Sequence, residues 1–137
     1  MTCGPRLRVL VADDHPAALD SLVALVSTEH EIVAAVRDGQ SAVSASHVLS
    51  PDILVLDIAM PGLTGIAAAM HLDAGGSTAK FVFVTARPDY SLLEHLCMLG
   101  SVGFVVKDRL ASDLLTAIRT VHSGRPYPSF EALLSQF

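Results

Sequence analysis

The sequence predicts an α/β domain in which helices flank a parallel sheet, and two observations support this class. Five short runs rich in Val, Ile, Leu and Phe recur along the chain, at residues 7–12, 31–36, 52–57, 80–85 and 103–106. Stretches of helical length alternate with them, a pattern typical of parallel sheets joined by right-handed crossovers. We therefore expect five strands and five helices in one domain of 137 residues.

Several of the runs are nearly continuous apolar strings, for example DILVLD at residues 52–57 and KFVFVT at residues 80–85. Central strands covered by helices on both faces have this composition, whereas half-exposed strands alternate apolar and polar residues. The sheet is therefore expected to be covered on both sides.

The stretches between the runs carry helix signals of unequal strength. Pro16 suits a first helical turn, and apolar residues follow it at the spacing of one helical face: Leu19, Leu22, Val23 and Val26. A similar face that starts at Leu110 ends at Gly124, a typical helix stop. Weaker helices are expected at residues 39–49, 64–72 and 88–99.

Polar residues follow the central strands at their carboxyl ends. They are Asp13 and Asp14 after the first strand, Asp57 at the end of the third, Thr85 at the end of the fourth and Lys107 after the fifth. Doubly wound sheets bind ligands at this edge. A single Asp after a strand is usually a turn former or a helix cap. That interpretation weakens when every central strand contributes a polar group of complementary chemistry.

Three clustered carboxylates need a cation. Two unit charges about 4 Å apart repel by roughly 4 kcal/mol at an effective dielectric of about 20. Hard oxygen ligands suit Mg²⁺. Such a site favours attack of Asp57 on phosphorus, while Lys107 and the metal offset the charge of the phosphoryl oxygens and Thr85 donates a hydrogen bond.

The composition indicates a soluble cytoplasmic domain that does not itself bind nucleic acid or a membrane. The chain is 51% hydrophobic and has a formal net charge of −5, and an acidic balance repels phosphate backbones. Cys3 and Cys97 have no metal-ligand or redox spacing. The apolar runs are too short for a secretory signal or a bilayer span. The six histidines are scattered, although His15 lies beside the acidic pair.

Four motifs in this order resemble those of a response-regulator receiver domain from bacterial two-component signalling. They are LVADDHP, DILVLDIAMPGLTGI, FVTA and GFVVKD, and the resemblance covers residues 6–124. The DDHP string, the KD pair and the segment AIRTVHSGRPYPS are most similar to the NarL-like subgroup. The resemblance implies a flavodoxin-like, doubly wound sheet with the strand order 2-1-3-4-5.

The resemblance implies that Asp57 is the phosphoacceptor and receives its phosphoryl group from a histidine kinase or a phosphotransfer protein. It implies Mg²⁺ as the cofactor, bound directly by Asp14 and Asp57, largely through water by Asp13, and by the backbone carbonyl of Ala59. Such a module is not a turnover enzyme, because it promotes only its own phosphotransfer and dephosphorylation.

The resemblance also implies that Lys107 pairs with the phosphoryl group and that Thr85 and Phe104 form the switch pair. Phe104 has no hydroxyl where many receivers carry Tyr, so its switch must use packing rather than a new hydrogen bond. Arg87 occupies a place that tunes dephosphorylation in the family.

The string LLEHLCML at residues 92–99 is unusually apolar for a helix that is half exposed in this family. Deeper burial is the favoured interpretation. The alternative is a partner or homodimer surface on the face between the fourth helix and the fifth strand, because contiguous exposed apolar patches mark interfaces. On that alternative, Leu93→Glu or Met98→Glu weakens self-association, which light scattering measures.

Residues 1–124 are expected to form the receiver domain and residues 125–137 a C-terminal tail or the start of a linker. NarL-like proteins commonly carry a helix-turn-helix DNA-binding domain after the receiver. The expected output is therefore control of transcription through such a domain, missing here, and the alternative is a stand-alone receiver that acts by protein–protein contact.

Two other functions share this topology or site. A flavodoxin-like cofactor binder or a phosphatase is disfavoured, because Asp13 and Asp14 would repel a cofactor phosphate and an aspartyl phosphatase usually has D-x-D on its first strand. A pseudo-receiver that only binds a partner is disfavoured because every polar site residue is present.

Overall fold

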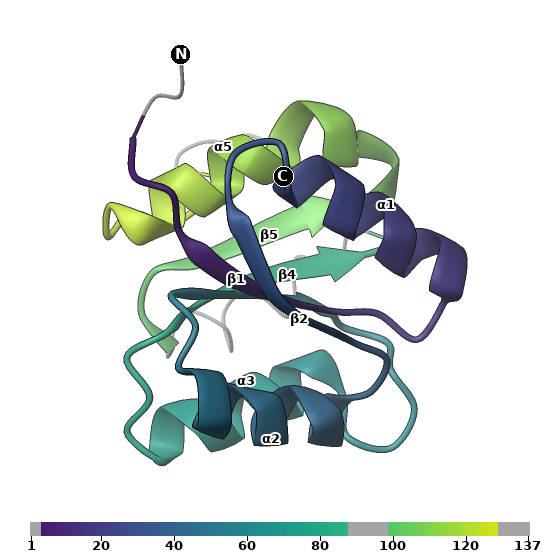
Figure 1. The fold of residues 1–137 in the computed structure, drawn as a ribbon, viewed down its shortest axis with the longest axis vertical. Helices are drawn as coiled ribbons and strands as arrows, with labels where there is room; N and C mark the ends of the chain where they lie inside the picture. The colour runs from purple at the N-terminus through teal and green to yellow at the C-terminus, as the bar shows by residue number, and fades with distance from the viewer. Residues whose placement is uncertain (1–3, 88–98, 129–137) are drawn as a thin grey trace.

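The structure, a computed structural model, describes residues 4–87 and 99–128 (Figure 1). Five parallel strands form one sheet in the order β2-β1-β3-β4-β5, which confirms the predicted class and strand order. The strands are β1 (Arg8–Ala12), β2 (Glu31–Val36), β3 (Ile53–Asp57), β4 (Lys80–Thr85) and β5 (Val102–Val106). The helices of the described part are α1 (Pro16–Val26), α2 (Gly39–Leu49), α3 (Gly65–Ala74), the short 3₁₀ turn η2 (Lys107–Arg109) and α5 (Leu110–His122).

Helices cover both faces of the sheet, with α1 and α5 on one side and α2 and α3 on the other (Figure 1). Successive residues of a strand point to opposite faces. Val9 and Val11 therefore join the core beneath α1 and α5, while Leu10 joins the core beneath α2 and α3. All residues of β3 are buried, as expected for a central strand.

Three helix ends follow from the residues found there. Asp38 caps α2 by accepting a hydrogen bond from the Ser41 N–H at 2.7 Å. Thr64 caps α3 in the same way for the Ala67 N–H at 3.2 Å. Gly124 follows α5 with a φ of 93°, the left-handed conformation that ends many helices.

The structure differs from the prediction at a few element ends. β1 begins at Arg8 and β3 at Ile53, one residue later than expected, and β5 begins one residue earlier, at Val102. The expected helix at residues 88–99 lies almost wholly outside the described residues, as do Leu93, Met98 and the dimer surface predicted there. No helix within residues 4–87 and 99–128 is long and apolar enough to cross a membrane.

Candidate functional site

The carboxyl ends of β1 and β3 bring three carboxylates together. β1 and β3 pair in parallel with Ala12 opposite Leu56, so the residues that follow, Asp13 and Asp57, lie side by side. Asp13 is 0% exposed and Asp57 is 2% exposed. Atoms of Asp13, Asp14, His15 and Asp57 that could ligate a metal all lie within 4.8 Å of one another. The predicted cluster is therefore formed.

Lys107 supplies positive charge to this cluster. It opens η2, directly after β5, and its Nζ lies 3.2 Å from Asp13 Oδ2 and 3.3 Å from Asp57 Oδ2. Burial alone would lower the pKa of the Lys107 ammonium, but the hydrogen bond to Asp13 and the charges of Asp57 and Asp13 raise this pKa above its ordinary value. The ammonium therefore stays charged between two buried carboxylates.

Burial is the main reason why the pKa of Asp57 is raised above its ordinary value, and the charge of Asp13 adds to the effect. The Ala59 N–H, which donates to Asp57 Oδ1 at 3.2 Å, and the Lys107 ammonium both oppose it. One ammonium thus offsets only part of the negative charge that the fold gathers here. More positive charge beside Asp57 would stabilise its ionised form.

The donor set fits Mg²⁺. Asp14 Oδ1 is buried and accepts no hydrogen bond from the residues that the structure describes, whereas the equally buried Asp13 Oδ2 has the Lys107 ammonium 3.2 Å away. Buried polar atoms without partners are rare in folded proteins, and carboxylate oxygens are the ligands that Mg²⁺ prefers. His15, which the sequence only placed beside the acidic pair, lies with Nδ1 3.2 Å from Asp14 Oδ1.

The two predicted switch residues lie on neighbouring strands, Thr85 at the carboxyl end of β4 and Phe104 in the middle of β5. Thr85, at the end of β4, pairs with Val106 and donates from Oγ1 to the Arg87 carbonyl at 2.9 Å. Phe104 is 5% exposed and packs in the core beneath α2 and α3, opposite Phe83. Whether they move with phosphorylation stays a prediction.

Gly65 has a role that the sequence analysis missed. A Cβ atom built at Gly65 would collide with the carbonyl oxygen of Asp57, and the Gly65 N–H donates to the Ile58 carbonyl at 3.3 Å. Only glycine lets α3 begin this close to the end of β3. A sequence signal existed in the PGLTG string, but a turn glycine and a close-approach glycine look alike in sequence.

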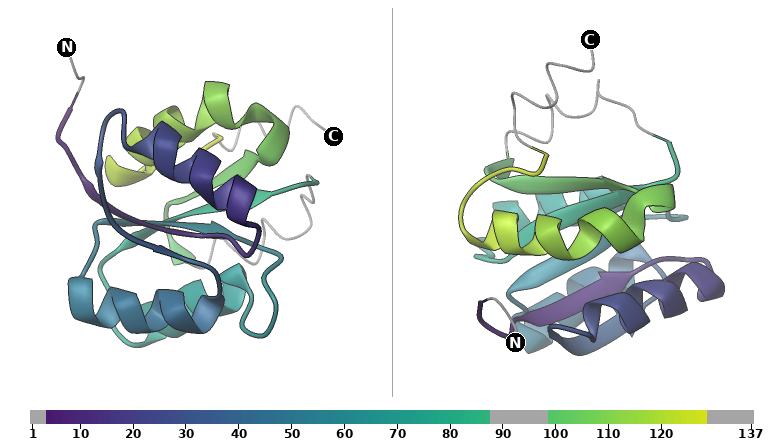
Figure 2. Two further views of the ribbon diagram at one scale, coloured as in Figure 1. Left: turned by 45° about the vertical axis from the view of Figure 1, so that its right-hand side comes forward. Right: turned by 90° about the horizontal axis from the view of Figure 1, so that it is seen from above.

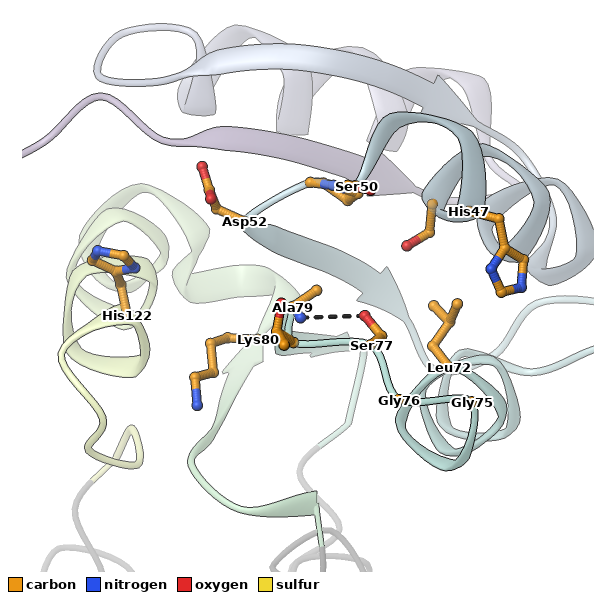
Figure 3. A pocket seen from close by; sticks show the side chains of 13 residues that line it. His47, Ser50, Asp52, Leu72, Gly75, Gly76, Ser77, Ala79, Lys80 and His122 are labelled. Carbon is orange, nitrogen blue, oxygen red and sulfur yellow. Dashed lines mark hydrogen bonds between the residues drawn. The ribbon is translucent and has the colours of Figure 1, made fainter.

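A separate cavity of about 460 Å³ lies at the opposite, amino-terminal edge of the sheet (Figure 3). Asp52, Ser77 and Lys80 are among the residues that line it. The Arg8 N–H donates to Asp52 Oδ2 at 2.8 Å, and the Ala79 N–H donates to Ser77 Oγ at 3.2 Å. These polar groups satisfy the backbone, so the acidic edge is the stronger candidate site.

Comparison with known proteins identifies a family for this chain. A family model described as the response regulator receiver domain matches residues 9–119. The chain is 31% identical over 141 residues to the transcriptional regulatory protein MctR of Rhizobium johnstonii, covering 99% of this chain and 66% of that protein. It is 30% identical over 125 residues to the DNA-binding transcriptional activator EvgA of Escherichia coli K12, covering 90% of this chain and 61% of that protein.

A solved structure shares the fold. The signal receiver domain of the putative response regulator NarL from Mycobacterium tuberculosis superposes with a TM-score of 0.81 at 25% identity, covering 89% of this chain and 100% of that one. This similarity agrees with the predicted NarL-like subgroup. The chain spans less than two thirds of the length of the two curated relatives, 66% and 61%.

Proposed function

The chain belongs to the response regulator receiver domain family, and from this premise we propose that it is switched by phosphorylation of Asp57. Its relatives are response regulators of the NarL and LuxR type, and the receiver domain is a signalling module. The family match argues against the two alternatives, a flavodoxin-like cofactor binder and a phosphatase. The donor proposed is a histidine kinase or a phosphotransfer protein.

The position of Asp57 is the observation that supports this proposal most. Its buried carboxylate shares the Lys107 ammonium with Asp13, and the Ala59 N–H fixes one oxygen. A phosphoryl group on the other oxygen would sit beside the Lys107 ammonium, which can offset the charge of the phosphoryl oxygens. Charge compensation and positioning are what phosphoryl transfer demands of a protein.

The transfer of the phosphoryl group to Asp57 needs no general base. An ionised Asp57 oxygen forms a bond to phosphorus while the bond from phosphorus to the donor's imidazole nitrogen breaks. The imidazole keeps the electron pair of that bond and takes a proton from solvent. Asp13, Asp14, Asp57 and the Ala59 carbonyl are the proposed ligands of Mg²⁺. When bound, this ion supplies further positive charge for the phosphoryl oxygens.

The proposed switch couples the new charge to packing. Thr85 would exchange its hydrogen bond to the Arg87 carbonyl for one to a phosphoryl oxygen. Phe104 would adjust within its apolar surroundings, because its side chain has no hydroxyl to find a new partner.

The proposed output is control of transcription in the cytoplasm. Both curated relatives are longer than this chain, and one is named a DNA-binding transcriptional activator. We propose that the receiver acts on a DNA-binding domain that follows it, through a surface that changes when Asp57 is phosphorylated. A homodimer through the face between the fourth helix and the fifth strand remains part of this proposal.

Incubation with acetyl phosphate and Mg²⁺ tests the proposal. We expect the intact mass of the wild type to rise by one phosphoryl group, and the mass of Asp57→Asn to stay constant. The gain should disappear when EDTA removes Mg²⁺. A wild type whose mass never changes, under conditions that phosphorylate another receiver domain, would contradict the proposed function.

A further inference from the structure

The polypeptide that follows α5 turns back and pairs with the edge of the sheet. The Tyr127 N–H donates to the Val102 carbonyl at 3.1 Å, and the Phe104 N–H donates to the Tyr127 carbonyl at 2.7 Å. Tyr127 thereby adds a one-residue parallel bridge opposite Gly103. The right-hand view of Figure 2 shows this segment leaving α5 and curving over β5. We call residues 125–128 the strap.

Several contacts hold the start of the strap in place. Gly124 takes a left-handed conformation, and its carbonyl accepts a hydrogen bond from Ser101 Oγ at 2.6 Å. The Arg125 N–H donates to the Thr120 carbonyl at 3.1 Å. The side chain of Tyr127 is half buried and packs against the core beneath α1 and α5. The strap is therefore docked on the domain by backbone and side chain alike.

The strap also contacts the first turn of α5, which directly follows the η2 turn that carries Lys107. The Tyr127 phenol lies beside the Asp113 carboxylate, and burial together with the charge and hydrogen bonding of that carboxylate raises the pKa of Tyr127. Asp113 Oδ2 in turn accepts a hydrogen bond from Arg109 Nε at 3.1 Å. Arg109 closes the η2 turn that Lys107 opens. Polar contacts thus run from the strap to Arg109, and the backbone of the three-residue η2 turn leads from Arg109 to Lys107.

We infer that Tyr127 is a positioning residue, which couples the polypeptide after the domain to Lys107 through Asp113 and Arg109, and to Phe104 through the backbone. This inference rests on the proposed phosphorylation of Asp57. Docking of the strap favours the η2 geometry in which Lys107 faces Asp57. Coupling between two equilibria is reciprocal, so we expect phosphorylation of Asp57 to change the docking equilibrium of the strap.

The size of the coupling follows from the few contacts involved. A single net hydrogen bond contributes about 1 kcal/mol, or roughly a fivefold change in an equilibrium. A one-residue bridge is therefore weak enough to open and close as the state of the site changes, whereas a long sixth strand would stay fixed. One end of the contact chain, Tyr127, is hydrogen-bonded to Phe104, and the other end, Arg109, lies two residues after Lys107.

The first test compares Tyr127→Phe, which removes only the hydroxyl, with Tyr127→Ala, which also removes the packing. We expect phosphorylation by acetyl phosphate to slow about threefold in the first variant and about tenfold in the second. Ser21→Ala is the control, because it removes an exposed hydroxyl from α1, far along the chain from the strap. The affinity for Mg²⁺ alone, measured by calorimetry, should stay the same in all three.

A double-mutant cycle separates positioning from a general loss of stability. In a Lys107→Gln background, Tyr127→Phe should cause no further slowing, because the ammonium that it positions is absent. An equal fold change in both backgrounds would overturn the positioning role. Equal rates for the wild type and both Tyr127 variants would overturn it as well.

Amide hydrogen exchange tests the reciprocal effect. We expect exchange at the Phe104 and Tyr127 amides of the wild type to change by several fold on phosphorylation, since both amides form the bridge. If the wild type is phosphorylated and these amides exchange at unchanged rates, the inference fails while the proposed function stands. If the wild type accepts no phosphoryl group, both fail.

Discussion

The two ends of β3 carry an aspartate each, and the fold treats them in opposite ways. Asp52 directly precedes the strand, is exposed, and accepts a hydrogen bond from the Arg8 N–H at 2.8 Å. Asp57 ends the strand, is 2% exposed, and shares a crowded edge with Asp13 and Lys107. An aspartate therefore accepts a backbone hydrogen bond at one end of the strand, whereas at the other end an aspartate belongs to a cluster of charged groups.

The two edges of the sheet contribute differently to the stability of the fold. At the amino-terminal edge, Asp52 and Ser77 accept hydrogen bonds from backbone N–H groups and so support the fold. At the carboxyl-terminal edge, Asp13 and Asp57 share the Lys107 ammonium, and the buried Asp14 Oδ1 has no hydrogen-bond donor within the described residues. Buried carboxylates whose charge is only partly offset destabilise a fold, so their presence indicates a site kept for function.

Removing the ammonium should have the largest effect. Lys107→Gln is expected to slow phosphorylation of Asp57 by about 100-fold or more, as when one preorganised donor to a developing charge is lost. Lys80→Gln removes a lysine from the cavity at the other edge and should change the rate less than about twofold. Time courses with acetyl phosphate measure both. Similar rates for the two variants would remove the functional distinction between the edges.

Crowding at the end of β3 gives the second prediction. Gly65→Ala is expected to lower the free energy of unfolding by about 3 kcal/mol, because the new methyl group meets the Asp57 carbonyl, which cannot move aside. Gly76→Ala is the control. It has open space around the new atom and a φ of 88°, so only backbone strain of about 1 kcal/mol is expected. Urea unfolding compares them, and equal losses would refute the close-approach role.

The sequence could predict the strands and the site because both depend on local patterns. The string DILVLD predicts a buried strand, and parallel topology then brings Asp13, Asp57 and Lys107 to one edge. The close approach at Gly65 and the bridge at Tyr127 depend on distances between segments far apart along the chain, for which no local pattern exists. The expected helix at residues 88–99 and its predicted dimer surface lie almost wholly outside the described residues.

The carboxylates of the two edges should differ in the sign of their effect on stability. Without Mg²⁺, Asp13→Asn is expected to raise the free energy of unfolding by about 1 kcal/mol, because it removes a buried charge beside Asp57. Asp52→Asn should lower it by about 1 kcal/mol, because a charged acceptor of the Arg8 N–H is lost. Thermal unfolding in EDTA measures both. Effects of the same sign would mean that the acidic edge is not destabilising.

His30 should give the smallest effect, seen in the pH dependence of stability. Burial lowers its pKa below 6.5 despite the nearby Glu29 carboxylate, with smaller lowering contributions from Arg119, Arg6 and His122. The unfolded chain therefore binds a proton that the folded state resists, and stability should fall as the pH drops through about 6.5. His30 Nδ1 accepts a hydrogen bond from the Leu7 N–H at 3.1 Å. His30→Gln keeps an acceptor there in its amide oxygen and should reduce this fall.

Urea unfolding at about pH 7.5 and about pH 5.5 compares this variant with His71→Gln, which replaces an exposed imidazole on α3. The pH dependence of His71→Gln should match that of the wild type. If the free energy of unfolding changes equally with pH in the wild type and in His30→Gln, the His30 imidazole does not contribute to the pH dependence of stability.

The intact masses of three proteins after treatment with acetyl phosphate and Mg²⁺ test the central claim most directly. They are the wild type, Asp57→Asn and Asp52→Asn, which change the two ends of the same strand. We predict that the wild type and Asp52→Asn each gain one phosphoryl group and that Asp57→Asn gains none. A phosphoryl group on Asp57→Asn, or its loss from Asp52→Asn alone, would contradict the assignment of the carboxyl-terminal edge as the phosphorylation site.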